Sequence, residues 1–100
     1  MSESSYKLTY SSSFDEEQKV FLKEVIIQAF KENNSDYERA SFISEKFEKQ
    51  YFQKNIEKYR GRWGCAVIKK DYGNITFPPS KGFAFAYYNG YIINIWCNYL

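Results

Sequence analysis

The clearest pattern of apolar and polar positions lies in FAFAYYNGYIINIW, residues 83–96. Asn89-Gly90 is at its centre, and this dipeptide tolerates the positive φ that a type I′ turn requires. The pattern predicts an antiparallel hairpin in which Tyr88 pairs with Tyr91 and the register continues outward. Cross-strand partners share a face, so one face carries Phe83, Phe85, Tyr87, Ile92, Asn94 and Trp96, and the other Ala84, Ala86, Tyr88, Tyr91, Ile93 and Ile95. Both faces are largely apolar, so each is expected to pack against another layer of the structure.

A helical period follows the first thirteen residues. At about 3.6 residues per turn, one broad arc collects Phe21, Leu22, Val25, Ile26, Ala29 and Phe30. Ser13-Phe14-Asp15-Glu16 has the form of a capping box, in which the Ser13 hydroxyl accepts from the Glu16 N–H. We therefore expect the helix to open there and to run to about Asn33. Val20 and Ile27, seven residues apart, fall on its polar side, and this helix alone does not explain them.

A second capping box, Ser35-Asp36-Tyr37-Glu38, opens a second predicted helix. Its apolar positions form a narrower stripe, made of Ala40, Ile43, Phe47 and Tyr51. Residues 52–62 either prolong this helix or form a loop, and Gly61 ends either version. The second helix therefore covers less of a sheet than the first.

The remaining apolar runs predict strands. Residues 1–13 form a polar N-terminal segment with a short edge strand from Tyr6 to Tyr10, and residues 14–100 form one domain. Residues 63–68 read as a strand, 69–71 as a turn, and 72–77 as a short strand ended by Pro78-Pro79. Proline cannot donate to a β-ladder, so that last strand is expected at an edge. The fold class is α+β, with two helices packed on an antiparallel β-sheet.

Two helices can cover the hairpin face bearing Ala84 and Ala86, where small side chains permit close approach. A third layer is then missing for the face bearing Phe83, Phe85, Tyr87 and Trp96. A second copy of the sheet would cover it in a twofold symmetric dimer. The alternative is that these rings are ordinary core packing within one chain.

Composition restricts the chemistry more than the partners. The net charge of +2 does not favour nucleic acid, whereas 21% aromatic residues, ten of them tyrosine, favour an interface. Histidine does not occur, which excludes histidine-activated nucleophiles and histidine zinc sites. Cys65 and Cys97 lack metal or redox spacing and are expected to be buried free thiols. Asp15-Glu16-Glu17 complements a helix dipole without catalysis. We expect no enzyme activity, no metal and no cofactor.

Neither a signal peptide nor an apolar run long enough to span a bilayer occurs in the sequence, so a cytoplasmic location is expected. One alternative function remains open. The segment 58–70 interleaves basic and aromatic residues, Lys58, Tyr59, Arg60, Arg62, Trp63, Lys69 and Lys70, as single-stranded nucleic-acid binders do.

Four stretches together carry a family resemblance: ISEKFEKQY (residues 43–51), WGCAV (63–67), YGNIT (72–76) and KGFAFAYYNGYIINIW (81–96). In element order, spacing and aromatic placement, the chain resembles the small, eight-kilodalton hub-type dynein light chains from Phe14 onward, as a divergent member. The resemblance implies a strand-swapped homodimer, in which residues 72–77 of one protomer complete the sheet of the other. It implies a cytoplasmic, cytoskeleton-associated, noncatalytic protein.

The resemblance also implies a function and a site. Family members bind extended peptides of partners such as dynein intermediate chain, as motor-complex subunits or dimerisation hubs, by strand addition. The peptide-binding positions that it implies are Gly73, Asn74, Ile75, Thr76, Phe77, Asp36, Tyr37, Phe83, Phe85 and Tyr87. Asp36 and Tyr37 match the helix start whose N–H groups receive a glutamine side chain. The implied dimer interface consists of Tyr72, Ile75, Phe77, Phe85, Tyr87 and Trp96.

Three features depart from the family pattern. Phe77-Pro78 replaces a common Thr-His pair, Tyr37 stands where lysine is common, and residues 52–62 resemble an insertion. A ring in place of a hydroxyl, and a lost backbone donor, change what a bound peptide would meet. For residues 74–77, an ordinary edge strand blunted by prolines is the alternative to peptide capture.

Overall fold

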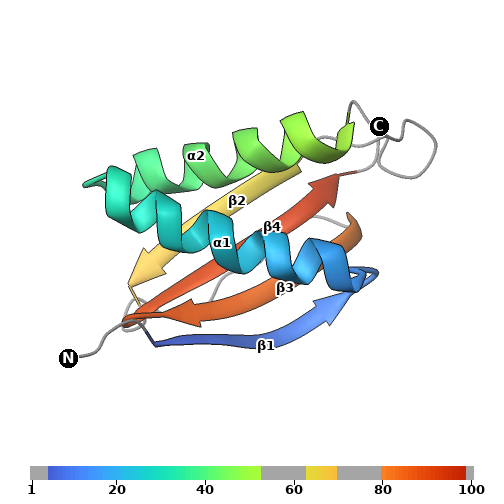
Figure 1. Cartoon of the computed structure of the whole chain (residues 1–100), viewed down its shortest axis with the longest axis horizontal. Helices are drawn as coiled ribbons and strands as arrows, with labels where there is room; N and C mark the ends of the chain where they lie inside the picture. Colours follow the sequence, from blue (N-terminus) through green and yellow to red (C-terminus); the bar gives the residue numbers. More distant parts are fainter. Residues whose placement is uncertain (1–4, 53–62, 70–79, 99–100) are drawn as a thin grey trace.

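Two helices pack on one face of a four-stranded antiparallel sheet (Figure 1). The computed structural model describes residues 5–52, 63–69 and 80–98. In chain order its elements are β1 (Tyr6–Ser12), α1 (Glu16–Glu32), α2 (Asp36–Phe47), the π-helical turn η1 (Glu48–Phe52), β2 (Trp63–Lys69), β3 (Ser80–Tyr88) and β4 (Tyr91–Asn98). The predicted α+β class is confirmed, and the strand and turn expected within residues 69–77 lie, apart from Lys69 at the end of β2, outside the described residues.

The strands are arranged in the order β1-β3-β4-β2. The β3–β4 hairpin has the predicted register, with Tyr88 opposite Tyr91 and Phe85 opposite Asn94. Its turn has positive φ at both central residues, 50° at Asn89 and 87° at Gly90, as a type I′ turn requires. The expected N-terminal strand is present as β1, and among the described strands β1 and β2 form the two edges of the sheet.

The start of α1 differs from the prediction. Its N-cap is Asp15: the Asp15 carboxylate accepts from the Gln18 N–H at 2.8 Å, and the Gln18 side-chain oxygen accepts from the Asp15 N–H at 3.0 Å. Ser13 instead lies in the connection from β1, with φ of 62°. The later start leaves Phe14 outside the helix, where its ring lies 5.9 Å from that of Trp63 in the core. The predicted Ser13 cap is therefore wrong by two residues.

The start of α2 agrees with the prediction, because the Ser35 hydroxyl accepts from the Glu38 N–H at 3.1 Å. The Phe47 end of α2 joins an aromatic cluster with rings of α1, η1 and β2. The ring centroid of Phe47 lies 5.0 Å from that of Phe21, 5.5 Å from that of Tyr51 and 4.9 Å from that of Trp63. The packing of these rings holds α2 against both α1 and β2.

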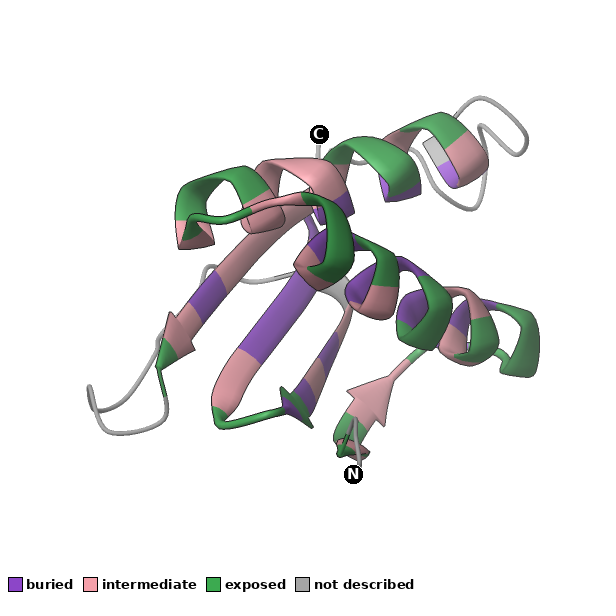
Figure 2. Cartoon of the chain, turned by 60° about the vertical axis from the view of Figure 1, so that its left-hand side comes forward, coloured by how far each residue is buried: buried purple, intermediate pink, exposed green. Residues whose placement is uncertain are grey.

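The helices cover the hairpin face that was expected to receive them. Figure 2 shows the buried positions of both helices turned toward the sheet. Ala84, Ala86, Ile93 and Ile95 are at most 1% exposed, and so are Leu22, Ile26, Ala29, Ile43 and Phe47 of the helices. Burial of each larger aliphatic side chain contributes roughly 1.5–3 kcal/mol, so this layer holds most of the fold's apolar stabilisation.

Arg39 fastens the other end of the helix pair. Its guanidinium lies 4.3 Å from the centroid of the Phe30 ring and 5.4 Å from that of Tyr91. The same group donates to the Asn33 carbonyl at 3.2 Å and pairs with Asp36 at 3.1 Å. One side chain therefore ties the α1–α2 connection to the hairpin turn end of the sheet.

Candidate functional site

The outer edge of β2 is the first feature that can receive a partner. Within the described part of the chain β2 pairs with β4 alone, as the strand order places it last. α2 lies over β2 (Figure 1), and the Trp63 N–H at the start of β2 donates to the Glu48 carboxylate at 3.1 Å. A strand added at this edge would therefore lie beside α2.

The second feature is the sheet face turned away from both helices, which we call the aromatic face: Tyr10, Phe83, Phe85, Tyr87 and Trp96. The rings of Tyr10 and Phe83 lie 5.5 Å apart and those of Phe83 and Phe85 5.8 Å apart. Tyr10 is 54% exposed and Tyr87 36% exposed. The face thus combines ring-to-ring packing with two exposed rings, Tyr10 and Tyr87, whereas Phe83, Phe85 and Trp96 are half-buried.

Trp96 connects this face to the β2 edge. Gly64 lies opposite Trp96 in the β2–β4 pairing, and a Cβ on Gly64 would lie 2.7 Å from the indole carbons. The indole therefore extends across β2 because that position has no side chain. The aromatic face and the β2 edge form one continuous surface.

Comparison with known proteins identifies the fold. No protein-family model matches the chain, and no curated protein matches it in sequence. Among solved structures, the dynein light chain-like domain of the Fasciola hepatica calcium-binding protein FhCaBP2, a mercury derivative, is similar over 95% of this chain and 93% of that one. The TM-score is 0.66 and the sequence identity 12%. The chain has a dynein light chain-like fold. At this identity the likeness concerns the fold alone.

Within this dynein light chain-like fold, the implied site residues fall into three groups. Phe83, Phe85, Tyr87 and Trp96 lie together on the aromatic face. Asp36 and Tyr37 form the first turn of α2, with Tyr37 80% exposed. Tyr72, Gly73, Asn74, Ile75, Thr76 and Phe77 lie outside the described residues. Their proposed roles stay predictions.

The first turn of α2 presents backbone donors. Helix geometry gives the N–H groups of Asp36 and Tyr37 no acceptor within the helix. The Ser35 hydroxyl accepts a hydrogen bond from the Glu38 N–H, and the Asp36 carboxylate forms an ion pair with Arg39. The side chain of Asp36 is therefore engaged in the structure, so any contact with a ligand here would use the backbone.

Asn94 is a residue of this surface to which sequence reasoning assigned no role. It is 1% exposed, and in the described part of the chain neither Oδ1 nor Nδ2 has a hydrogen-bond partner. Its cross-strand neighbours are Phe85 and Ala66. An amide between Ile93 and Ile95 was the signal in the sequence, because a buried polar group without a partner costs about 1–3 kcal/mol.

The side chains that could take part in chemistry, the cysteine thiols above all, are placed as structural residues. Neither Cys65 nor Cys97 forms a disulfide, and burial raises the pKa of the Cys65 thiol far above its usual range. Such a thiol stays protonated and is a poor nucleophile. No group of three His, Cys, Asp or Glu side chains among the described residues could hold a metal ion. None of the helices described is long and apolar enough to cross a membrane.

The nucleic-acid alternative receives no support at its one described aromatic residue. Trp63 is 6% exposed and packs in the aromatic cluster, so its ring does not present a face for base stacking. Residues 58–62 and Lys70 lie outside the described residues, and Lys69 is exposed at the end of β2.

Proposed function

We propose that the chain is a noncatalytic, dimeric dynein light chain that binds extended peptide segments of partner proteins by β-strand addition. The observation that carries this proposal is the continuous surface formed by the β2 edge and the aromatic face, beside α2. A sheet edge supplies a row of backbone hydrogen-bond groups, and adjacent side chains supply selectivity. The dynein light chain-like fold supports an interaction domain of this kind.

The aromatic face is the proposed dimer interface. Aromatic residues are enriched at protein interfaces, and an interface of two sheet faces resembles a domain core cut in half. Packing of two copies would cover Phe85, Tyr87 and the indole of Trp96 around a twofold axis. The β2 edge would then receive a strand from the second copy, which the family resemblance assigns to residues 72–77.

The peptide is proposed to bind beside that added strand and near the first turn of α2. There the N–H groups of Asp36 and Tyr37 would receive a side-chain carbonyl of the peptide, such as that of glutamine. A single groove of this type binds in the micromolar range, about −8 kcal/mol. Two grooves on one dimer would align two peptide chains and raise their effective concentration. This suits a motor-complex subunit or a dimerisation hub, in the cytoplasm and on the cytoskeleton.

The absence of catalysis is part of the proposal. The Asp15 carboxylate at the start of α1 is used in the cap, where it accepts from the Gln18 N–H. The Cys65 thiol is held protonated by burial, which raises its pKa. Both groups thus serve the fold rather than a reaction.

Titration of nitrogen-15-labelled protein with a glutamine-centred peptide tests the binding site by NMR. Shifts are expected at the amides of Asp36, Tyr37 and Glu38 and of residues 73–77, the strand beside which the peptide is proposed to bind. A control peptide with glutamine replaced by alanine should bind about tenfold more weakly, because one hydrogen-bonded group is lost. No shifts from a protein that remains dimeric would contradict the groove.

Sedimentation equilibrium of charge variants tests the dimer. Phe85→Lys places a charge in the proposed interface and is expected to give a monomer or an unfolded chain. Val20→Lys adds the same charge at an exposed apolar position on α1, away from the aromatic face, and should leave the dimer intact. Monomeric wild-type protein at high micromolar concentration would contradict the proposal.

A further inference from the structure

The solvent side of α1 carries a second apolar stripe. Val20 is 57% exposed and Ile27 half-buried, although both are aliphatic residues within a helix. Seven residues make about two helical turns, so the two side chains lie on the same side of α1. The core-facing residues Leu22 and Ile26 are buried on the other side. On its solvent side α1 therefore presents Val20, and the outer part of Ile27, which also packs against the core, among charged residues.

Two hollows accompany this stripe. The first, about 450 Å³, is lined by Val20, Phe21 and Tyr51, with Glu16, Glu17 and Glu24 around them. The second, about 410 Å³, contains Ile27 and is lined by Glu24, Gln28, Lys31 and Glu32. Because both include Glu24, they follow one another along α1. We call them together the α1 groove.

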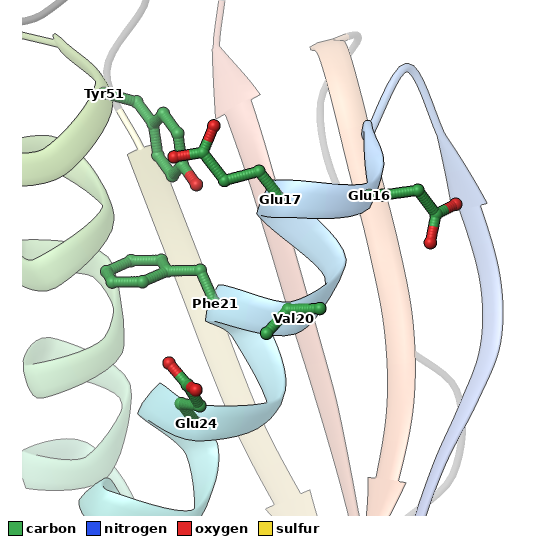
Figure 3. Close-up of a pocket in the computed structure, with 6 residues that line it drawn as sticks. All are labelled: Glu16, Glu17, Val20, Phe21, Glu24 and Tyr51. Atoms are coloured by element: carbon green, nitrogen blue, oxygen red, sulfur yellow. The ribbon is translucent and has the colours of Figure 1, made fainter.

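The groove is acidic in a chain whose net charge is +2. Its lining has four glutamates and one lysine, a formal charge of −3. Glu16 pairs with Lys19 at 3.2 Å and Glu32 accepts from Gln28 at 2.9 Å. Glu17 and Glu24 have no ion-pair partner within the described part of the chain. Figure 3 shows both on the side of α1 that bears Phe21, with Glu16 pointing away.

We propose that the α1 groove docks a basic amphipathic helix of a partner protein. Two apolar side chains seven residues apart on that helix would enter the two hollows, and lysine or arginine residues beside them would face Glu17 and Glu24. α1 has 17 residues, about 25 Å at 1.5 Å per residue, so it accommodates about five turns of such a helix. The successive hollows match a helical repeat rather than an extended strand.

Charge selects this occupant over others. A second copy docking through the same groove would place the Glu17 and Glu24 carboxylates of both copies close together, and these like charges repel. Nucleic acid and anionic membranes carry the same sign as the groove and are disfavoured for the same reason. The surface is separate from the proposed peptide groove, because that groove lies at the β2 edge beside the first turn of α2, whereas the α1 groove is lined by residues of α1 and Tyr51.

The probe for this inference is a synthetic helical peptide with leucines seven residues apart and lysines at the flanking positions. Amide shifts of the labelled full chain are expected along α1, at Glu17, Val20, Glu24 and Ile27. A peptide of the same composition in scrambled order, and one with glutamate in place of lysine, are the controls. Both should bind at least about tenfold more weakly, because the apolar spacing or the charge match is lost.

Variants locate the binding. The double variant Glu17→Lys/Glu24→Lys should weaken binding of the lysine peptide about tenfold and strengthen that of the glutamate peptide. Glu45→Lys, an exposed glutamate of α2, is the matched control and should change either affinity less than about twofold. Because these positions are exposed, circular dichroism of all variants should match the wild type. This reversal of preference is a result that general destabilisation would not produce.

Several outcomes would overturn the inference. Equal binding of the scrambled peptide would mean charge attraction without a groove. Shifts confined to the aromatic face, or binding unchanged in the double variant, would place the peptide elsewhere. If Val20→Asp no longer self-associates, the α1 groove is a contact between copies of this chain. The Val20→Asp result would also contradict the proposed dimer interface, but none of these results bears on binding of the glutamine-centred peptide, so the two binding proposals fail separately.

Discussion

The indole of Trp96 lies directly against the Cα of Gly64, so that a single added methyl group would be 2.7 Å from the ring. Trp96 is on β4 and Gly64 on the edge strand β2. The contact extends the aromatic face to the edge where a partner strand is proposed to add. It also explains a glycine in a strand, where glycine otherwise weakens the pairing.

Gly64→Ala should therefore destabilise the fold by about 1–3 kcal/mol, because the rigid indole must move or the strands must separate. Urea denaturation measures the loss, and tryptophan fluorescence should report a changed environment. The same substitution in a Trp96→Leu background should cost less, since the ring is gone. An equal cost in both backgrounds would show that the clash with the indole is not the cause.

The N-terminal cap of α1 makes a second prediction. Asp15→Ala should cost about 1 kcal/mol, because the Gln18 N–H loses its acceptor. Ser13→Gly should instead be neutral or stabilising, since φ at Ser13 is 62° and glycine adopts positive φ without strain. Thermal unfolding of the two variants distinguishes the caps. A larger loss of stability for Ser13→Gly than for Asp15→Ala would mean that Ser13, not Asp15, is the N-cap.

This pair of residues also shows where sequence reasoning stops. The hairpin register could be predicted because Asn89-Gly90 determines both the turn and the pairing by local geometry. Two overlapping cap motifs compete at Ser13 and Asp15, and neither is stronger locally. The choice depends on a distant contact, the insertion of Phe14 beside Trp63, which no local pattern contains.

The candidate surfaces were predicted in part for the same reason. Alternation along the strands was enough to place Phe83, Phe85 and Trp96 on one face. It did not indicate that the Trp96 indole would extend over Gly64, nor that Val20 and Ile27 would line hollows. The position of the indole depends on the pairing of β4 with β2, and the hollow at Val20 depends on Tyr51 of η1, both far apart in sequence. The hollow at Ile27 is lined by residues of α1 alone.

Arg39 is expected to tolerate lysine poorly. Lysine keeps the charge but not the planar contact with Phe30 or the geometry that reaches both Asn33 and Asp36. Arg39→Lys should cost about 1–2 kcal/mol in chemical denaturation. Lys46→Ala removes an exposed cation over the Phe42 ring and serves as control, with a loss below about 0.5 kcal/mol. Similar losses for both would mean that the stacked guanidinium has no special role.

Because the Tyr6 phenol is partly buried, we expect the fold to lose stability at alkaline pH. Burial raises the pKa of its phenol from 10.0 to about 12. Below pH 10 the phenol is neutral in both states. Between about pH 10 and 12 the unfolded chain loses this proton while the folded chain keeps it, so the free energy of unfolding falls. Urea denaturation at pH 9 and pH 11 should show a smaller fall for Tyr6→Phe than for the wild type, and an equal fall would contradict the assignment.

Asn94→Leu should stabilise the chain by about 1–3 kcal/mol. The buried carboxamide has no hydrogen-bond partner among the described residues, and leucine of similar size removes its desolvation cost. Urea denaturation at low protein concentration measures the effect on the fold. Asn34→Leu, at an exposed position between α1 and α2, is the control and should change stability by less than about 0.5 kcal/mol. Destabilisation by Asn94→Leu would mean that the amide makes a bond outside the described residues.

The strand order also has a consequence for synthesis on the ribosome. β1 emerges first but pairs with β3, and the Ser5 N–H meets the Asn89 side chain 84 residues further along the chain. The helices likewise emerge before the hairpin that covers their apolar faces. Until β3 and β4 have left the exit tunnel, Leu22, Ile26 and Phe47 have no sheet to bury them. The apolar faces of both helices are therefore expected to stay exposed, and open to chaperones, until β3 and β4 have left the exit tunnel.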